Sequence, residues 1–395
     1  MFPCSLRAPA RQNRVEPSGK LSKDYLASPN KCSSQGDFWG ARPDSFRMEA
    51  SEQPTLRSSR VRRWLRHLFR EWTIESWRPI APAFAKPDPA NWDDAQITLA
   101  WLGHATVLIN FFGIKILTDP VLFPRIGIRL PGFTIGPKRL TAPALQFREL
   151  PKIDLVLLSH AHFDHLDLRT LRCFNQSTSV ITARATRDLL RRTRFRDVIE
   201  LDWGESKTLQ TVAGDIEITA FAVKHWGARK QRDTYRGYNG YLLERNQRQI
   251  IFAGDTAMTD SFAELRGRGE IAKPGSAGQP LQFTRNATSA EATRRGWATQ
   301  PVESTGCPSG AKRVDLAIMS IGAYNPWIHS HCTPEQAIDM ANAAGARFIM
   351  PVHHQTFRLS FEPFREPIER FVAALGNTPE RIALREIGET FVLPL

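Results

Sequence analysis

The stretch SHAHFDHLD, residues 159–167, follows a run of apolar residues and places three histidines and an aspartate within positions 160–165. Imidazole and carboxylate groups suit zinc, an ion without redox activity. A chance HxHxDH pattern is expected about once in a few thousand chains with this histidine content. We therefore predict that His160, His162, Asp164 and His165 bind metal.

The spacing within this stretch favours two metal positions. Residues two apart in a strand point to the same face, so His160 and His162 are expected to share one ion. The chain then turns, and Asp164 with His165 can face a second point close by. One short segment can therefore serve two metals.

Three later apolar strands also end in residues that can bind metal. DIEITAFAVKH (215–225) ends on His225, QIIFAGD (249–255) ends on Asp255, and RFIMPVHH (347–354) contains His353. Each residue alone could be an ordinary polar group at a strand end, but functional loops collect where strands end on one rim of an α/β domain. We expect all three to complete the two metal sites, with the Asp255 carboxylate as the bridge.

The order of apolar patterns predicts an α/β sandwich, with two sheets and helices outside them. Strands are expected at ITLAWLG (97–103), TVLINFFG (106–113), IKILTD (114–119), DLVLLSH (154–160) and DLAIMSIGAY (315–324), besides the three above. Helices are expected at 168–175, 183–192, 333–344 and 362–375.

The composition of other segments suggests how the chain is divided. Residues 1–55 are rich in Pro, Ser, Gly and charge and are expected to form a disordered lead-in. Residues 56–96 hold a basic amphipathic helix at 61–72 and a linker; the helix could pack on the main domain or lie on an anionic membrane. Residues 97–395 are expected to form the catalytic domain, with a flexible insertion at 267–313.

Net charge, cysteine content and hydropathy limit the classes of partner and the cellular compartment that we expect. A formal net charge of +13 suits phosphates, anionic lipid or nucleic acid. Five cysteines without CxxC spacing argue against a disulfide framework and for a reducing compartment. No apolar run of about 18 residues exists, and the N-terminus lacks the apolar region of a secretory signal. We expect a cytoplasmic protein, with peripheral membrane contact through 61–72 as an added possibility.

Several motifs together resemble a known family. These are WLGHAT (101–106), LTDP (117–120), SHAHFDHLD (159–167), KHW (224–226), FAGDT (252–256), IGAY (321–324) and PVHHQTF (351–357). They look like the metallo-β-lactamase superfamily and, more narrowly, the N-acyl-phosphatidylethanolamine phospholipase D group with its bacterial relatives. The narrower resemblance depends on GPKR (136–139), IGAY and the HHQTF spacing, and the match runs over about 97–375 without the insertion.

The resemblance implies a metallo-β-lactamase αββα sandwich and a ligand set. His160, His162 and His225 would hold one zinc ion; Asp164, His165 and His353 would hold the other; Asp255 would bridge. His331 and Phe163 match substrate-contacting positions. Phe163 stands where the family often has Tyr, and His354 stands where the lipid enzyme has Trp.

Asp119 and His104 are expected to orient the ligands rather than to bind metal. A ligating histidine usually donates its other N–H to a carboxylate or carbonyl, and Asp119 at a strand end could accept that hydrogen bond. The alternative for Asp119 is an ordinary turn residue before Pro120.

These features predict a hydrolase with two zinc ions per chain and no organic cofactor. A hydroxide shared by the metals would attack phosphorus or a carbonyl carbon, and Asp255 would orient this hydroxide. Asp164 would hold one of the metals, and His331 would bind the phosphate or protonate the leaving group. The expected substrate is a phospholipid or other small phosphodiester, with no nucleic-acid partner. The alternatives are a lactonase or other ester hydrolase, an RNA-processing nuclease, a di-iron redox enzyme and a non-catalytic scaffold.

Overall fold

The computed structural model describes residues 77–230, 232–266 and 314–394. The predictions for the lead-in at 1–55, the helix at 61–72 and the insertion at 267–313 lie outside these residues. Within the described end of the expected linker, a 3-10 turn spans Pro89–Asn91. None of the described helices has the length and apolarity needed to cross a bilayer.

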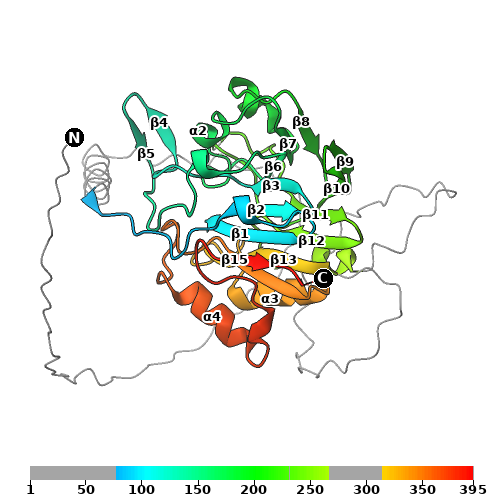
Figure 1. The fold of residues 1–395 in the computed structure, drawn as a ribbon. Coiled ribbons are helices and arrows are strands. Elements are labelled where there is room, and N and C mark those ends of the chain that lie inside the picture. Colours follow the sequence, from blue (N-terminus) through cyan, green and yellow to red (C-terminus); the bar gives the residue numbers. More distant parts are fainter. Residues whose placement is uncertain (1–76, 231, 267–313, 395) are drawn as a thin grey trace, which may run out of the picture. The chain divides into compact units, whose positions relative to one another are not determined.

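Two mixed sheets form the body of the domain (Figure 1). The first sheet has the order β15 (Thr390–Val392), β1 (Ile97–Gly103), β2 (Thr106–Phe111), β3 (Ile114–Thr118), β6 (Leu155–Leu158), β7 (Ser179–Ala183) and β8 (Val198–Leu201). The second has the order β14 (Phe348–Val352), β13 (Val314–Ser320), β12 (Arg248–Phe252), β11 (Gly240–Arg245), β10 (Gly214–Phe221) and β9 (Ser206–Thr211). A separate hairpin pairs β4 (Ile128–Leu130) with β5 (Phe133–Ile135).

The two sheets pack face to face because alternate side chains of the second sheet join the core of the first. Ile250, Phe252 and Ile318 belong to the apolar cluster that contains the first sheet. Their neighbours Ile251 and Ala317 point the other way, as the period of two in a strand requires. Strands buried on both faces need near-continuous apolar runs, which is why these segments could be recognised in the sequence.

Helices cover the outer faces of both sheets. The outward side chains of the second sheet pack with α3 (Pro334–Ala343), α4 (Glu366–Leu375) and the 3-10 segment Asp260–Leu265. The layer beside the first sheet is thinner and consists of α2 (Leu168–Leu171) with the 3-10 segments Phe147–Glu149 and Arg187–Arg192. A further 3-10 turn spans Pro379–Arg381. The predicted αββα sandwich is confirmed.

Two helix predictions need correction. The helix expected at 183–192 is wrong at its start, because Ala183 ends strand β7 and a 3-10 segment follows only at Arg187–Arg192. The β-branched run Val180-Ile181-Thr182 favours a strand there. The helix expected at 168–175 is shortened to Leu168–Leu171.

The strands that lead to the predicted site residues run in one direction. β3 and β6 are parallel, and β1 is parallel to β3 because both pair antiparallel with β2. In the second sheet, β12, β13 and β14 are parallel, and β10 shares their direction because both β10 and β12 pair antiparallel with β11. Each sheet therefore gathers the carboxyl ends of these strands on one edge, and the isolated bridge between His160 and Tyr238 joins the two edges.

The packing of α4 on the second sheet can be tested with a matched pair of substitutions. Phe371 on α4 is fully buried, whereas Phe361 is 80% exposed. Phe371→Ala is expected to lower the free energy of unfolding by about 3–5 kcal/mol through lost burial and a cavity. Phe361→Ala should change it by less than about 0.5 kcal/mol. Urea unfolding followed by tryptophan fluorescence measures both, and equal midpoints would show that α4 does not seal the sheet.

Candidate metal centre

Three imidazoles meet in a first cluster at the shared strand edge. The Nε2 atom of His160 lies 2.9 Å from Nδ1 of His162, and Nε2 of His225 lies 3.3 Å from the same Nδ1. Two nitrogen ligands of one tetrahedral zinc ion are about 3.3 Å apart. The spacing of the cluster therefore fits a single ion.

The outer nitrogens show which lone pairs face inward. Nδ1 of His225 lies 2.8 Å from the Ser330 carbonyl, which can only accept, so this Nδ1 carries the proton and Nε2 offers its lone pair. Burial lowers the pKa of His160 well below its usual value and that of His225 to about 3, so both rings are neutral. Neutral imidazole is the form that binds metal.

A second cluster combines two imidazoles with two carboxylates. Nε2 of His165 lies 3.0 Å from Oδ2 of Asp255 and 3.5 Å from Oδ2 of Asp164. Nε2 of His353 lies 3.2 Å and 3.4 Å from the same two oxygens. Burial would lower the pKa of His353, but Asp255 and Asp164 outweigh it and raise that pKa to about 9. The buried carboxylates thus require positive charge at this point.

The carboxylate of Asp255 lies between the two clusters. Its Oδ2 atom, in contact with the second cluster, is also 3.9 Å from Nε2 of both His160 and His225. Its Oδ1 atom is 2.9 Å from the Ser320 hydroxyl, which keeps Oδ2 turned toward the histidines. One oxygen therefore faces both groups, as a bridging ligand must.

Asp119 anchors histidines of both clusters. Its Oδ2 accepts hydrogen bonds from Nδ1 of His165 at 2.6 Å and from the Ser159 hydroxyl at 2.5 Å, and its Oδ1 accepts from the Ser159 N–H at 2.7 Å. Because the Ser159 hydroxyl donates to Asp119, it accepts from Nδ1 of His160 at 2.8 Å. Both Nε2 lone pairs then point into the clusters, and the orienting contact expected of Asp119 is present.

His104 supports the second cluster from behind. Burial lowers its pKa to about 3, and the neutral ring donates from Nε2 to Oδ2 of Asp164 at 3.0 Å. Its backbone carbonyl accepts from the indole of Trp101 and its N–H donates to Thr356, so the ring is fixed by the sheet edge. The structure therefore places His104 where an orienting residue would act.

The two residues predicted to contact substrate lie in different places. His331 sits at the rim between the clusters, with ring centres 5.1 Å from His225 and 5.4 Å from His353, and burial lowers its pKa to about 4. Phe163 turns away from the ligands, and its ring lies 4.0 Å from the guanidinium of Arg229. Only His331 of this pair adjoins the metal clusters.

Several supporting residues were missed by sequence reasoning. Ser159 directly precedes the first histidine, so its position could have suggested its role, but Ser320 ends an apolar strand without any local signal. Arg229 donates from Nη1 to the carbonyls of Ala161 and Leu166 and so ties the two ends of the metal-binding loop together. Its partners lie more than sixty positions away in sequence, so no short pattern could reveal them.

Close backbone approach explains two glycines in the recognised motifs. A Cβ atom on Gly254 would lie 2.7 Å from Cβ of Ser159, and one on Gly322 would lie 2.2 Å from the carbonyl oxygen of His353. Either contact would force the backbone apart. Glycine at position 254 lets the strand end that carries Asp255 approach the one that carries His160, and glycine at position 322 lets the end of β13 approach His353.

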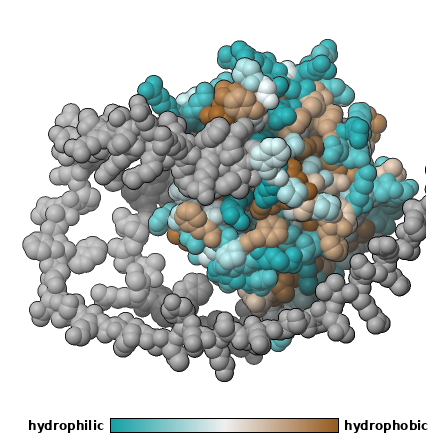
Figure 2. Space-filling view, turned by 90° about the vertical axis from the view of Figure 1, so that its left-hand side faces the viewer, coloured by the Kyte–Doolittle hydropathy of each residue, from teal (hydrophilic) through white to brown (hydrophobic). Residues whose placement is uncertain are grey.

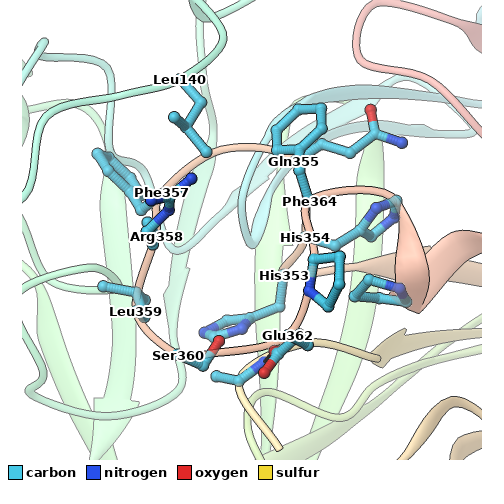
Figure 3. Close-up of a pocket in the computed structure, with 14 residues that line it drawn as sticks. Leu140, His353, His354, Gln355, Phe357, Arg358, Leu359, Ser360, Glu362 and Phe364 are labelled. Carbon is cyan, nitrogen blue, oxygen red and sulfur yellow. Dashed lines mark hydrogen bonds between the residues drawn. The ribbon is translucent and has the colours of Figure 1, made fainter. Parts of the chain in front are cut away.

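The segment after β14 curves round a small cavity of about 40 Å³ (Figure 3). His353 packs against His104 at 4.0 Å between ring centres, whereas His354 packs against Trp101 at 4.6 Å. Adjacent histidines therefore point in different directions, and only His353 reaches the clusters. His354 is a buried neutral residue, since burial lowers its pKa to about 3.

Comparisons with known proteins concern the family and the fold rather than single residues of the site. Residues 115–272 match the family model described as Beta-lactamase superfamily domain. The chain is 29% identical over 318 residues to an uncharacterized protein of Mycobacterium tuberculosis, with 78% of this chain and 71% of that protein covered. It is also 29% identical over 300 residues to the mitochondrial N-acyl-phosphatidylethanolamine-hydrolyzing phospholipase D of Saccharomyces cerevisiae, with 73% of this chain and 54% of that protein covered.

A solved structure supports the fold. The isothiocyanate hydrolase from Delia radicum gut bacteria aligns with a TM-score of 0.52 at 16% identity, covering 75% of this chain and all of that one. At this identity the likeness concerns the fold alone.

The anchoring role of Asp119 gives a testable prediction. Asp119→Asn leaves one acceptor oxygen for three donors: Nδ1 of His165 and the hydroxyl and N–H of Ser159. The tautomers of His160 and His165 are then no longer fixed. We expect metal affinity to fall about 10–100-fold, measured by competition with a fluorescent chelator. Asp215→Asn, at an exposed carboxylate on β10, is the control and should leave affinity unchanged. Wild-type affinity in Asp119→Asn would show that this carboxylate does not anchor the ligands.

Proposed function

We propose that this chain, whose β-lactamase superfamily domain has the metallo-β-lactamase αββα fold, is a dinuclear zinc phosphodiesterase of the N-acyl-phosphatidylethanolamine phospholipase D type. The observation that carries the proposal is the pair of clusters that share one oxygen of Asp255. His160, His162 and His225 would hold one ion, and Asp164, His165 and His353 the other. This donor set of imidazole and carboxylate suits zinc.

The fit to metal rests on atoms that no protein group satisfies. Burial would lower the pKa of His165, but Asp255, Asp164 and Asp119 outweigh it and raise the pKa well above its usual value. Nε2 of His165 is buried without a hydrogen-bond partner and faces the carboxylates of Asp255 and Asp164. That arrangement is repulsive unless positive charge lies between them. Two bound zinc ions would supply that charge, lower the pKa of water toward neutrality and offset negative charge that develops in the reaction.

The chain's own residues would position the reacting groups. Asp255, held by Ser320, lies at the centre of the site, where it would orient the attacking water. His331 at the rim can donate an N–H to a phosphoryl oxygen. In the net reaction the water oxygen forms a bond to phosphorus, the bond from phosphorus to the leaving oxygen breaks, and the alcohol departs with a proton.

Apolar side chains near the metal clusters support a substrate with a lipid-like part. Trp226 follows ligand His225, is 52% exposed and lies 4.6 Å from the His162 ring. Trp327 and Ile328, 56% and 39% exposed, belong to the segment that leads to His331. Together with the yeast relative's name, this rim favours a phospholipid over a small polar phosphodiester. We further propose that the protein works in the cytoplasm at the surface of a membrane.

The second candidate function is a lactonase or other ester hydrolase that uses the same clusters. Phe163 lacks the hydroxyl that the resemblance leads one to expect, and it faces Arg229 rather than the metal clusters. The site must therefore recognise substrate without that hydrogen bond. A compact neutral ester would need it less than a charged phosphodiester would.

Elemental analysis tests the metal content. We expect about two zinc ions per chain, since two complete donor sets are present. Asp255→Ala should lose metal and all turnover because the shared oxygen is gone, whereas Asp215→Ala should match wild type. Full zinc content with unchanged turnover in Asp255→Ala would defeat the mechanism; iron in place of zinc would favour redox chemistry, and no metal would favour a scaffold.

The substrate class is tested by comparing three kinds of substrate. Purified protein is assayed with N-acyl-phosphatidylethanolamine in mixed micelles, with bis(4-nitrophenyl) phosphate and with a panel of lactones. We expect the lipid to give the highest kcat/KM, because only it can contact both the metal clusters and the apolar rim. Trp226→Ser should then raise KM for the lipid while leaving bis(4-nitrophenyl) phosphate turnover nearly unchanged. A preference for lactones would select the second candidate.

A further inference from the structure

We propose that the β4–β5 hairpin is a docking surface for an anionic lipid bilayer. The hairpin stands apart from both sheets (Figure 1) and forms its own two-stranded sheet. Neither the metal clusters nor the proposed reaction uses it. The docking surface is therefore separate from catalysis, and only its benefit to a lipid substrate rests on the proposed function.

One face of the hairpin is entirely apolar. Ile128 pairs with Ile135, and Leu130 pairs with Phe133, so these four side chains share a face. They are 59%, 48%, 37% and 46% exposed, respectively. A short hairpin that presents four large apolar side chains to the outside forms a contiguous patch of the kind that marks an interaction site.

The polar face of the hairpin points toward the domain. Arg129 pairs with Thr134 on this face, and Thr134 is 8% exposed and accepts a hydrogen bond from Arg169 at 3.4 Å. The usual arrangement in a soluble hairpin buries the apolar face and exposes the polar one. In this hairpin the apolar face is instead the more exposed one.

Cationic side chains surround the hairpin. A cleft of about 820 Å³ runs beside β4 and is lined by several basic residues: Arg125, Arg129, Arg169, Arg172, Arg229 and Lys230. The acidic residue among the described lining residues is Asp167, which is buried and accepts the N–H groups of Arg169 and Thr170. Figure 2 shows hydrophilic and apolar residues side by side on the face of the domain that lies at the left in Figure 1. Apolar residues beside basic ones match an anionic bilayer, which offers acyl chains beneath charged headgroups.

Other partners fit the same surface less well. A nucleic acid would match the cations but leave four apolar side chains exposed to water, because most of its contacts are to phosphate. A second copy of the chain would bring two cationic clefts together, and like charges at an interface oppose association. The bilayer is the partner that satisfies both features.

The cleft also connects the hairpin with the metal-binding loop. Phe163, next to ligand Asp164, lines the cleft together with Ile128 and Leu130 of the hairpin. Docking through the hairpin would bring lipid headgroups to the side of the domain on which the cleft reaches this loop. If the proposed phospholipase activity is correct, docking should therefore lower KM for lipid in vesicles.

Vesicle sedimentation of the full chain tests the proposal. Wild type is expected to sediment with vesicles of phosphatidylcholine and phosphatidylglycerol, and not with phosphatidylcholine alone. The double substitution Phe133→Ser with Ile135→Ser should lower the partition coefficient at least about tenfold through lost apolar contact. The double substitution Arg129→Glu with Arg172→Glu should lower it similarly and remove the dependence on anionic lipid.

Matched controls come from exposed residues elsewhere on the domain. Val212→Ser with Phe361→Ser removes two exposed apolar side chains, and Arg148→Glu with Arg191→Glu reverses two exposed charges; both should bind vesicles like wild type. Circular dichroism melting identifies any variant that fails to fold. Wild-type binding by a folded Phe133→Ser, Ile135→Ser protein overturns the proposal, as does a dimer in sedimentation velocity that this variant converts to monomer.

Two further measurements distinguish bilayer docking from polyanion binding and from catalysis. Binding to a single-stranded oligonucleotide that equals vesicle binding and survives the Phe133→Ser, Ile135→Ser change would overturn the proposal in favour of a polyanion site. Asp255→Ala should bind vesicles like wild type. If the wild-type protein binds vesicles but does not hydrolyse the lipid, the docking surface is retained and the phospholipase activity is rejected. If the protein hydrolyses the lipid but its binding does not depend on the hairpin, the phospholipase activity is retained and the docking surface is rejected.

Discussion

The carboxylate of Asp119 is the contact on which the geometry of the metal centre depends. It accepts a hydrogen bond from Nδ1 of His165 and another from the Ser159 hydroxyl, which in turn accepts one from Nδ1 of His160. One buried carboxylate therefore sets the histidine tautomers in both clusters. It lies directly after β3, and the Ser159 N–H that it accepts lies directly after the parallel strand β6. The pairing of β3 with β6 therefore fixes the position of Asp119 relative to Ser159, and through them the orientation of His160 and His165.

Strand direction explains why residues distant in sequence converge. The turns that bring them together require backbone conformations of high free energy. His104, Asp119 and His353 each adopt positive φ, at 54°, 30° and 65°, which for residues other than glycine costs of order 1–3 kcal/mol each. All three directly or closely follow buried strands that can hold such strain. The two sheets thus serve as rigid supports from which short, unfavourable turns point side chains at one another.

The sequence allowed the fold class and the convergence of the candidate ligands to be predicted, because both depend on buried strands that end in polar groups. His225, Asp255 and His353 could be named since each follows an apolar run, and their meeting follows from strand direction. Ser320 and Arg229 could not, because their partners are defined only by tertiary contact. The β4–β5 hairpin was missed for a different reason: its apolar alternation spans three residues a strand, too short to stand out. Phe163 could be named, but not its orientation toward Arg229.

Arg229 joins the loop that holds the candidate metal ligands to the cationic cleft. One guanidinium nitrogen holds the carbonyls of Ala161 and Leu166, at either end of the loop that carries His162, Asp164 and His165, while the group as a whole covers Phe163 in the wall of the cationic cleft. Burial lowers its pKa only to about 10, so the charge persists at neutral pH. An anion that drew this guanidinium toward the cleft would have to compete with both carbonyls. The cleft can therefore accept anionic groups through its exposed cations, while Arg229 keeps the metal ligands in place.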